Sequence, residues 1–329
     1  MSLNLSIALT INPRTSPILE KRVPIEGVDY EATGLFPSVL FYRQLKFAEF
    51  DVSEMSLSSL MISTAQGPTP WVAIPVFATR VFFHIDMIVR AGAGIEVPAQ
   101  LRGRRMGVPE YQQTRAVWVR GALQHEFGVA PTDLHWFMER TPDRSHGGST
   151  GFQPPKGVQL TYVPEDKDLG TMLLSGELDA AVHHFNERTA VDRALVDVRG
   201  RSEIRPLFPD AAAEARRYYK STGIFPINHC VVIRRSLLEQ HPGLDLAVYR
   251  AFVSASEMTA SEPIGDLGHV YSPTVTYDPV ADGHADAAAY GITKSRLVLE
   301  TLSSYLFEQG LTHRPVGLEE IFSPSTPLS

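Results

Sequence analysis

The sequence predicts an α/β fold with more than one domain. Short alternating or apolar runs, typical of β-strands, are separated by segments of helical length, which is the pattern of α/β proteins rather than of all-α or all-β proteins. The chain has 329 residues, and at about 150 residues per domain a chain of this length forms roughly two domains. It is 43% hydrophobic and 20% charged, as in ordinary globular proteins and unlike disordered or fibrous chains.

The expected elements follow from the spacing of apolar residues. The segment from Leu3 to Leu9 alternates apolar with small or polar residues, which is the period of a half-buried strand. Thr114 is a suitable N-cap for a helix, and Gly176 a suitable end for another. Strands are expected at 3–9, 28–34, 50–54, 72–78, 81–89, 105–108, 159–162, 180–184 and 229–233. Helices are expected at 114–127, 168–175, 242–261 and 293–309.

Charge and cysteine content exclude several functional classes. The 37 acidic residues exceed the 30 Lys and Arg residues, giving a net charge of −7, so no broad basic face would attract nucleic acid. The only cysteine, Cys230, cannot form an internal disulfide, and no Cys/His spacing matches a structural zinc site. The sequence also lacks a P-loop and a dinucleotide-binding glycine motif.

No segment is expected to cross a membrane or to direct export. No Lys or Arg precedes the apolar residues of the first strand, so the N-terminus does not have the pattern of a signal peptide. Residues 55–79 carry no charge, but Gly67, Pro68, Pro70 and Pro75 interrupt the run. These observations predict a cytoplasmic protein and leave a homo-oligomer open.

The segment that begins at Arg80 is the most informative for function. Its odd positions are apolar, whereas its even positions include Arg80, Phe82, His84 and Asp86. On a strand these four side chains share one face, where they could bind an aromatic acid. Alternatively, this face is the polar side of an edge strand, with Asp86 paired to Arg90 or His84. His84 and Asp86 with a third histidine would also suit a divalent metal, which therefore stays open.

Two predicted strand-to-helix turns could bind an anion. The first has Glu54 near the end of a strand and Ser56 and Ser58 at the start of a helix, where free backbone amides and hydroxyls suit a negative group. The second has Tyr111 and Arg115, and the guanidinium could hold a carboxylate through two hydrogen bonds. Ordinary helix capping and solvated side chains produce the same patterns.

Histidines at the ends of two further strands complete the candidate set. His183 and His184 end one predicted strand, and at most one of them enters a given site because adjacent strand residues face opposite sides. Asn228 and His229 begin another strand, where a buried histidine needs a partner. Each of these histidines could be structural or functional.

Three segments, 49–59, 223–235 and 290–311, resemble the 4,5-dihydroxyphthalate decarboxylase family, and the resemblance spans almost the whole chain in the same order. It implies the fold of the type 2 periplasmic substrate-binding proteins, with two α/β lobes, two crossing strands and a central ligand cleft. Lobe 1 would comprise 1–90 and 230–329, and lobe 2 would comprise 91–229. The crossings would lie near 81–89 and 229–233.

The resemblance also implies a reaction. This is the non-oxidative decarboxylation of a hydroxylated aromatic acid, as from 4,5-dihydroxyphthalate to 3,4-dihydroxybenzoate and CO2 in phthalate degradation. A proton adds to the ring carbon that bears the carboxylate, a ring hydroxyl donates electrons and CO2 leaves, so no organic cofactor is needed. Such a site requires a general acid, a group that polarises the hydroxyl and a cation for the retained carboxylate.

The resemblance gives the candidate residues expected roles, with two other functions left open. Either His84 or His229 would supply the proton, Arg80 or Arg115 would bind the carboxylate, and Glu54 with His184 would contact the hydroxyls. The remaining substrate contacts would come from Phe82, Ser56, Ser58, Tyr111 and Asn228. The same fold could instead bind an aromatic acid without catalysis, or act as a dehydratase or another lyase.

Overall fold

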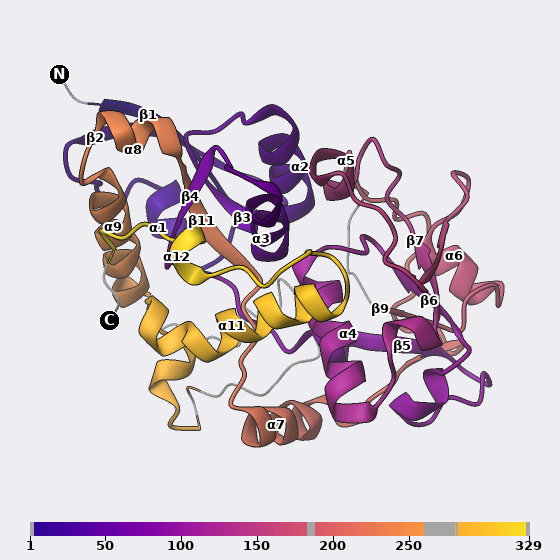
Figure 1. Cartoon of the computed structure of the whole chain (residues 1–329). Coiled ribbons are helices and arrows are strands. Elements are labelled where there is room, and N and C mark those ends of the chain that lie inside the picture. The colour runs from indigo at the N-terminus through magenta and orange to yellow at the C-terminus, as the bar shows by residue number, and fades with distance from the viewer. Residues whose placement is uncertain (1–2, 183–187, 260–279, 281, 327–329) are drawn as a thin grey trace.

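The computed structural model describes residues 3–182, 188–259, 280 and 282–326 and contains two β-sheets flanked by helices (Figure 1). The first sheet has five strands in the order β2-β1-β3-β11-β4, and the second has six in the order β10-β5-β9-β6-β7-β8. The predicted α/β class is therefore confirmed.

The first sheet combines strands from distant parts of the chain. β1 pairs in parallel with β2 and β3, whereas β11 runs antiparallel between β3 and β4. In Figure 1 the orange β11 lies among the indigo and purple strands of this sheet. Its strands are β1 (Leu3–Leu9), β2 (Val28–Gly34), β3 (Val52–Ser56), β4 (Trp71–Ile74) and β11 (His229–Arg234). The helices of this part of the chain are α1 (Ser16–Leu19), α2 (Pro37–Phe47), α3 (Leu57–Gln66), α8 (Arg235–Gln240), α9 (Leu244–Met258), η4 (Ala285–Ala288), α11 (Ile292–Glu308) and α12 (Leu318–Ile321).

The second sheet is formed by the middle of the chain. β6 pairs in parallel with β7 and with β9, and β7 pairs in parallel with β8. β5 runs antiparallel to both β9 and β10. Its strands are β5 (Met87–Arg90), β6 (Arg105–Val108), β7 (His135–Met138), β8 (Gln159–Tyr162), β9 (Ala180–Val182) and β10 (Ile204–Pro206). The helices are η1 (Phe83–Asp86), η2 (Pro98–Leu101), α4 (Thr114–Phe127), η3 (Pro131–Asp133), α5 (His146–Thr150), α6 (Leu169–Leu174) and α7 (Ala211–Thr222).

Two chain connections between the sheets lie side by side. Val81 N–H donates to the carbonyl of Pro226 at 3.0 Å, and Asn228 N–H donates to the carbonyl of Thr79 at 3.1 Å. These bonds form an antiparallel bridge at residues 80 and 227, close to the expected crossings. β5 belongs to the second sheet, so residues 87–90 lie with the strands of lobe 2 and not, as the predicted boundary placed them, with lobe 1.

The strand predicted over 81–89 is wrong in its first half. Phe83–Asp86 form a 3₁₀-helix, and the strand begins only at Met87. A 3₁₀-helix has three residues per turn, so it does not place alternate side chains on one face. The side chains of Arg80, Phe82, His84 and Asp86 therefore point to different partners. The alternation of polar and apolar residues arises because each of these side chains contacts a different neighbouring element.

The strand predicted at 72–78 also ends early, at Ile74. The next residue, Pro75, lacks the N–H that pairing with a neighbouring strand requires.

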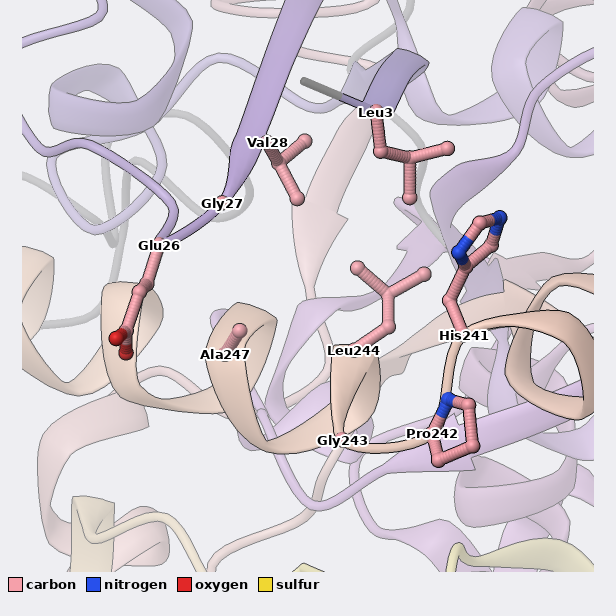
Figure 2. A pocket seen from close by; sticks show the side chains of 9 residues that line it. All are labelled: Leu3, Glu26, Gly27, Val28, His241, Pro242, Gly243, Leu244 and Ala247. Atoms are coloured by element: carbon pink, nitrogen blue, oxygen red, sulfur yellow. The ribbon is translucent and has the colours of Figure 1, made fainter. Parts of the chain in front are cut away.

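One large buried apolar cluster extends through both lobes, with Leu5 and Ile7 of the first sheet, Val117 of α4 and Trp136 of the second sheet among its members. A separate open hollow of about 570 Å³ lies at the beginning of β1 and β2. Figure 2 shows Leu3, Val28 and Leu244 pointing toward one another there. The hollow is at the opposite end of β1 from the polar side chains of the candidate site.

No helix within the described ranges combines the length and the apolar character that a membrane span requires. The cytoplasmic location and the possible homo-oligomer stay predictions.

Candidate functional site

The centre of the site lies on two neighbouring strands of the first sheet. Glu54 is in β3 and His229 begins β11, and the register pairs His229 with Ser56 and Val231 with Glu54. The side chains of Glu54, Ser56 and His229 therefore share one face. Glu54 Oε1 lies 3.5 Å from His229 Nδ1, and both residues are buried. A buried carboxylate beside an imidazole can hold or transfer a proton.

Thr10, which follows β1, fixes the carboxylate of Glu54. Its backbone N–H and its hydroxyl donate to Glu54 Oε2 at 2.6 and 2.5 Å. Asn12 Nδ2 donates to the hydroxyl oxygen of Thr10 at 3.1 Å. Oε1 of Glu54 accepts no hydrogen bond from the described part of the chain, so this oxygen is left for His229 or a bound molecule.

Tyr290 lies near this carboxylate, and two arginines lie near Tyr290. Arg14 donates to backbone carbonyls, and its guanidinium lies 5.8 Å from the centre of the Tyr290 ring. Arg80 donates to two backbone carbonyls and, at 2.8 Å, to the Ser295 hydroxyl. Burial and the charge of Arg14 lower the pKa of Arg80 to about 9, and burial raises the pKa of Tyr290, with Glu54 adding to the rise.

Neither Arg14 nor Arg80 forms an ion pair with a carboxylate of the described residues. A pKa of about 9 leaves Arg80 charged at neutral pH. Two guanidinium groups without a counter-ion among the described residues are suited to a carboxylate ligand, which they can bind through the N–H groups that the backbone does not occupy.

The second lobe contributes His146, from α5. Its Nδ1 lies 3.0 Å from the Ser59 hydroxyl in α3, and its Nε2 lies 3.5 Å from Arg140 Nη1. Arg140 is held by Asp192 through bonds of 2.9 and 2.7 Å. Burial, together with the charges of Arg140 and His229, lowers the pKa of His146 to about 3. The imidazole is therefore neutral and carries one N–H. Because Nε2 faces an N–H donor of Arg140, Nε2 is the acceptor, and the imidazole proton is on Nδ1, which donates to the Ser59 hydroxyl.

The two predicted strand-to-helix turns meet between the lobes. Ser56 Oγ lies 3.0 Å from Thr114 Oγ1, and Ser58 N–H donates to Thr114 Oγ1 at 3.1 Å. The Ser58 hydroxyl donates to the carbonyl of Gln112 at 2.7 Å. The first turns of α3 and α4 are thus in contact, and both helix N-termini favour negative charge at this junction.

Phe41, in α2, packs edge-on against both imidazoles. The centre of its ring lies 4.5 Å from that of His229 and 5.9 Å from that of His146. Histidines from the two lobes are therefore brought together around one aromatic side chain.

Two buried carboxyl groups lie deeper in the second lobe. Glu110 accepts a hydrogen bond from the His146 N–H at 3.1 Å, and Glu139 accepts from the N–H groups of Leu169 and Arg193 at 3.0 and 3.1 Å. Burial raises the pKa of each carboxyl to about 7.

Several predicted residues have partners outside this group. Arg115 Nη1 lies 2.8 Å from Asp86 Oδ2 in a buried ion pair, so Asp86 is not paired with Arg90 or His84. His84 Nε2 lies 3.1 Å from Glu214 Oε1. The structure brings neither His84 nor Arg115 into contact with Glu54 or His229.

The other predicted contacts are distributed over both lobes. Phe82 stacks on Phe225, with ring centres 4.8 Å apart. Tyr111 is buried in the second lobe beneath the guanidinium of Arg120. Asn228 is buried and uses its backbone in the bridge between the lobes. His184 lies outside the described residues. Among the described residues, no three metal-ligating side chains come together as a metal site would require.

Sequence reasoning missed Thr10, Arg14, His146 and Tyr290. The first two follow the carboxyl end of β1, the edge at which open α/β sheets bind ligands, and this rule could have found them. His146 is in a glycine-rich segment whose spacing at 147–151, Gly-x-Ser-x-Gly, matches that of serine hydrolases. However, Ser149 is exposed on α5 and does not occupy a strand-to-helix turn.

Comparison with known proteins identifies the family. No protein-family model matches the chain. The chain is 32% identical to the 4,5-dihydroxyphthalate decarboxylase of Comamonas testosteroni, over 98% of this chain and 97% of that protein. The chain belongs to the 4,5-dihydroxyphthalate decarboxylase family. A relative of the same name from Pseudomonas putida is 39% identical over 180 residues, which cover 55% of this chain and 70% of that one.

Solved structures similar to this decarboxylase-family chain confirm the predicted fold. The periplasmic aliphatic sulphonate binding protein SsuA of Escherichia coli matches with a TM-score of 0.52 at 14% identity, covering 99% of this chain and 94% of SsuA. The putative sulfonate-binding SsuA of Methylobacillus flagellatus gives a TM-score of 0.54 at 13% identity, covering 98% and 92%. The Candida albicans protein CA3427 is described as having the generic periplasmic binding protein fold. It matches with a TM-score of 0.52 at 11% identity, covering 98% of this chain and 97% of CA3427.

Proposed function

We propose that the chain catalyses the non-oxidative decarboxylation of 4,5-dihydroxyphthalate to 3,4-dihydroxybenzoate and CO2. Membership in the family named for this reaction supports the substrate. The observation that carries the proposal is the buried Glu54–His229 pair, which is linked through Tyr290 to Arg14 and Arg80, two arginines with no carboxylate partner among the described residues. An acid–base pair linked in this way to two available cations is suited to an aromatic dicarboxylate.

The substrate has its two carboxylates on one edge of the ring and its two hydroxyls on the opposite edge. We assign the carboxylate edge to the first lobe, where Arg14 and Arg80 would bind the retained carboxylate and so place the neighbouring ring carbon near His229. The hydroxyl edge would then face Ser59 and His146, which belong to the junction between the lobes.

In the proposed reaction His229 gives a proton to the ring carbon that bears the leaving carboxylate. The bond from that carbon to the carboxylate breaks, its electron pair returns to the ring and CO2 departs. The hydroxyl para to this carbon supplies electron density to it, and the helix N-termini at Ser56 and Thr114 favour the negative charge on that hydroxyl. A solvent proton then restores His229, so the net change is one proton consumed for each CO2 released.

Glu54 would act through His229 and not on the para hydroxyl. The reacting carbon and its para hydroxyl are on opposite sides of the ring, whereas Glu54 Oε1 lies 3.5 Å from His229 Nδ1. One close pair cannot reach both positions. Glu54 therefore stabilises the imidazolium that donates the proton, which differs from its expected contact with the hydroxyls.

The test is to incubate the purified, chelator-treated protein with 4,5-dihydroxyphthalate and to measure CO2 together with 3,4-dihydroxybenzoate. We expect equal amounts of both products. Phthalate, which lacks the hydroxyls, should bind without reacting. Tight binding of 4,5-dihydroxyphthalate without turnover, even when divalent metals are restored, would contradict the proposal and favour an aromatic-acid binding protein.

A further inference from the structure

Arg120 is a cation in the interior of the second lobe, outside the candidate site. It is in α4 and its exposed fraction is 0%. Its guanidinium carbon lies 3.8 Å from the centre of the Tyr111 ring and 5.6 Å from that of Trp136. Nε donates to Gln309 Oε1 at 2.8 Å, whereas Nη1 and Nη2 make no hydrogen bond to any residue that the structure describes.

The described residues provide no carboxylate to balance this charge. The charged groups around Arg120 do not include an acidic side chain of the described ranges, and the neighbouring titratable group is the phenol of Tyr111. Burial lowers the pKa of Arg120 to about 10, which leaves the side chain charged at neutral pH. A buried charge without a counter-charge is strongly unfavourable, and stacking on aromatic rings offsets only part of this cost.

The atoms without partners around Arg120 are hydrogen-bond donors. They are the two terminal nitrogens of Arg120 and the hydroxyl of Tyr111, which is also buried and makes no hydrogen bond to a described residue. The Gln309 amide is fixed, because its Nε2 donates to the carbonyl of Val117 at 3.0 Å while its oxygen accepts from Arg120. Buried polar atoms of this kind almost always have a partner, such as an ordered water or ion.

We propose that Arg120 and Tyr111 form a binding site for a small monovalent anion of the size of chloride. Such an anion would accept hydrogen bonds from Nη1, Nη2 and the phenol, and would balance the charge, which a water molecule cannot do. Because Arg120 is fully buried with its guanidinium over the rings of Tyr111 and Trp136, a small ion fits this place better than a larger ligand. The site is independent of the proposed decarboxylation, because none of its residues contacts Glu54 or His229.

The bound ion would stabilise the contact between the lobes. Arg120 is in α4 of the second lobe, whereas Gln309 caps α11, which belongs with the first sheet. The anion is expected to keep the guanidinium in the orientation that bonds Gln309. Chloride should therefore raise the thermal stability of the whole protein, without a requirement for substrate.

The experiment is thermal unfolding of the full chain in sodium chloride and in sodium gluconate at constant ionic strength. We expect a saturable rise in Tm with chloride, reproduced by bromide and absent in gluconate. Arg120→Met should abolish the rise. Tyr111→Phe, which removes one hydroxyl, should weaken the apparent chloride Kd by about fivefold, as the loss of one hydrogen bond predicts. Arg250→Met, at an exposed position, should respond to chloride as the wild type does.

Two results would overturn the proposal. One is a Tm that is the same in chloride and gluconate. The other is a chloride effect of unchanged midpoint in Tyr111→Phe and Arg120→Met. If Arg120→Met does not fold, Tyr111→Phe decides alone, and an anomalous diffraction peak for bromide between the two side chains provides an independent measurement.

Discussion

Thr10 donates two hydrogen bonds, one from its amide and one from its hydroxyl, to a single oxygen of Glu54. β1 and β3 are neighbours in the sheet, with Ala8 opposite Ser53, so the residue that follows β1 is placed beside the carboxylate. The other oxygen of Glu54 is thereby directed to His229. Thr10 is a positioning residue in the proposed reaction, since it acts through Glu54 and His229.

Thr10→Val should lower kcat about tenfold with little change in KM, because a hydrogen bond to a charged group is worth roughly 1.5–3 kcal/mol. The variant keeps the backbone donor and the side-chain shape, and it loses only the hydroxyl. With one stabilising bond removed, the carboxylate is held less firmly beside His229, so the loss should appear in kcat and not in KM. Thr10→Ser should restore kcat. A Thr10→Val enzyme with wild-type kcat would exclude this role.

His229→Ala should reduce kcat by about 10²–10⁴-fold, the usual contribution of a positioned general acid. His84→Ala is the matched comparison, because His84 is equally buried but bonded to Glu214. It should keep more than half of the wild-type kcat per folded molecule. Steady-state assays on both variants, with circular dichroism to confirm folding, test the assignment. If both variants keep over half of the activity, neither histidine is the proton donor.

The sequence predicted the part of the site that depends on local pattern. Glu54, Ser56 and His229 were found because they mark the ends of strands, and strands that pair in one sheet bring such ends together. Arg80 was found as well, but on a strand face that does not exist, because residues 83–86 turn as a 3₁₀-helix. Alternation of polar and apolar residues cannot distinguish a strand from a segment whose side chains enter different surroundings.

The rest of the site depends on contacts between distant segments. Tyr290 and Arg14 are nearly 280 residues apart in the chain and meet only in the folded protein. His146 is a loop residue by its sequence pattern, and its burial follows from the packing of α5 against α2 and α3. No periodicity encodes such a position, so these residues could be identified only from the structure.

Arg14→Met should weaken the binding of phthalate, measured by calorimetry, by about tenfold or more, as expected when a charge-assisted hydrogen bond to a carboxylate is lost. Phthalate is the appropriate probe because it carries both carboxylates and does not react. Arg250→Met, an exposed arginine far along the chain, is the control and should bind as the wild type does. Unchanged affinity in Arg14→Met would remove this residue from the proposed carboxylate site.

The contribution of two buried carboxyl groups of the second lobe to stability should fall as the pH rises from about 4.5 to about 7, because their pKa values are raised. It is opposite in sign to the contribution of His146, whose pKa is lowered. Burial raises the pKa of Glu110 and of Glu139 to about 7, whereas in the unfolded chain both lose their protons near their ordinary values, about 4.3. Between these limits the folded state binds more protons than the unfolded state, so the free energy of unfolding decreases with pH. The contribution is greatest below the unfolded pKa and is lost as the pH passes the folded pKa.

Urea unfolding at pH 5 and pH 8 measures this difference, to which each group should contribute on the order of 1–3 kcal/mol. Glu110→Gln and Glu139→Gln keep the side-chain shape without a titratable proton, so each should reduce the difference between the two pH values. Glu257→Gln, at an exposed position on α9, should leave the difference unchanged. If Glu110→Gln and Glu139→Gln show the same pH dependence as the wild type, these carboxyls are ionised in the folded protein, and the buried interior of the second lobe must supply charge compensation for both.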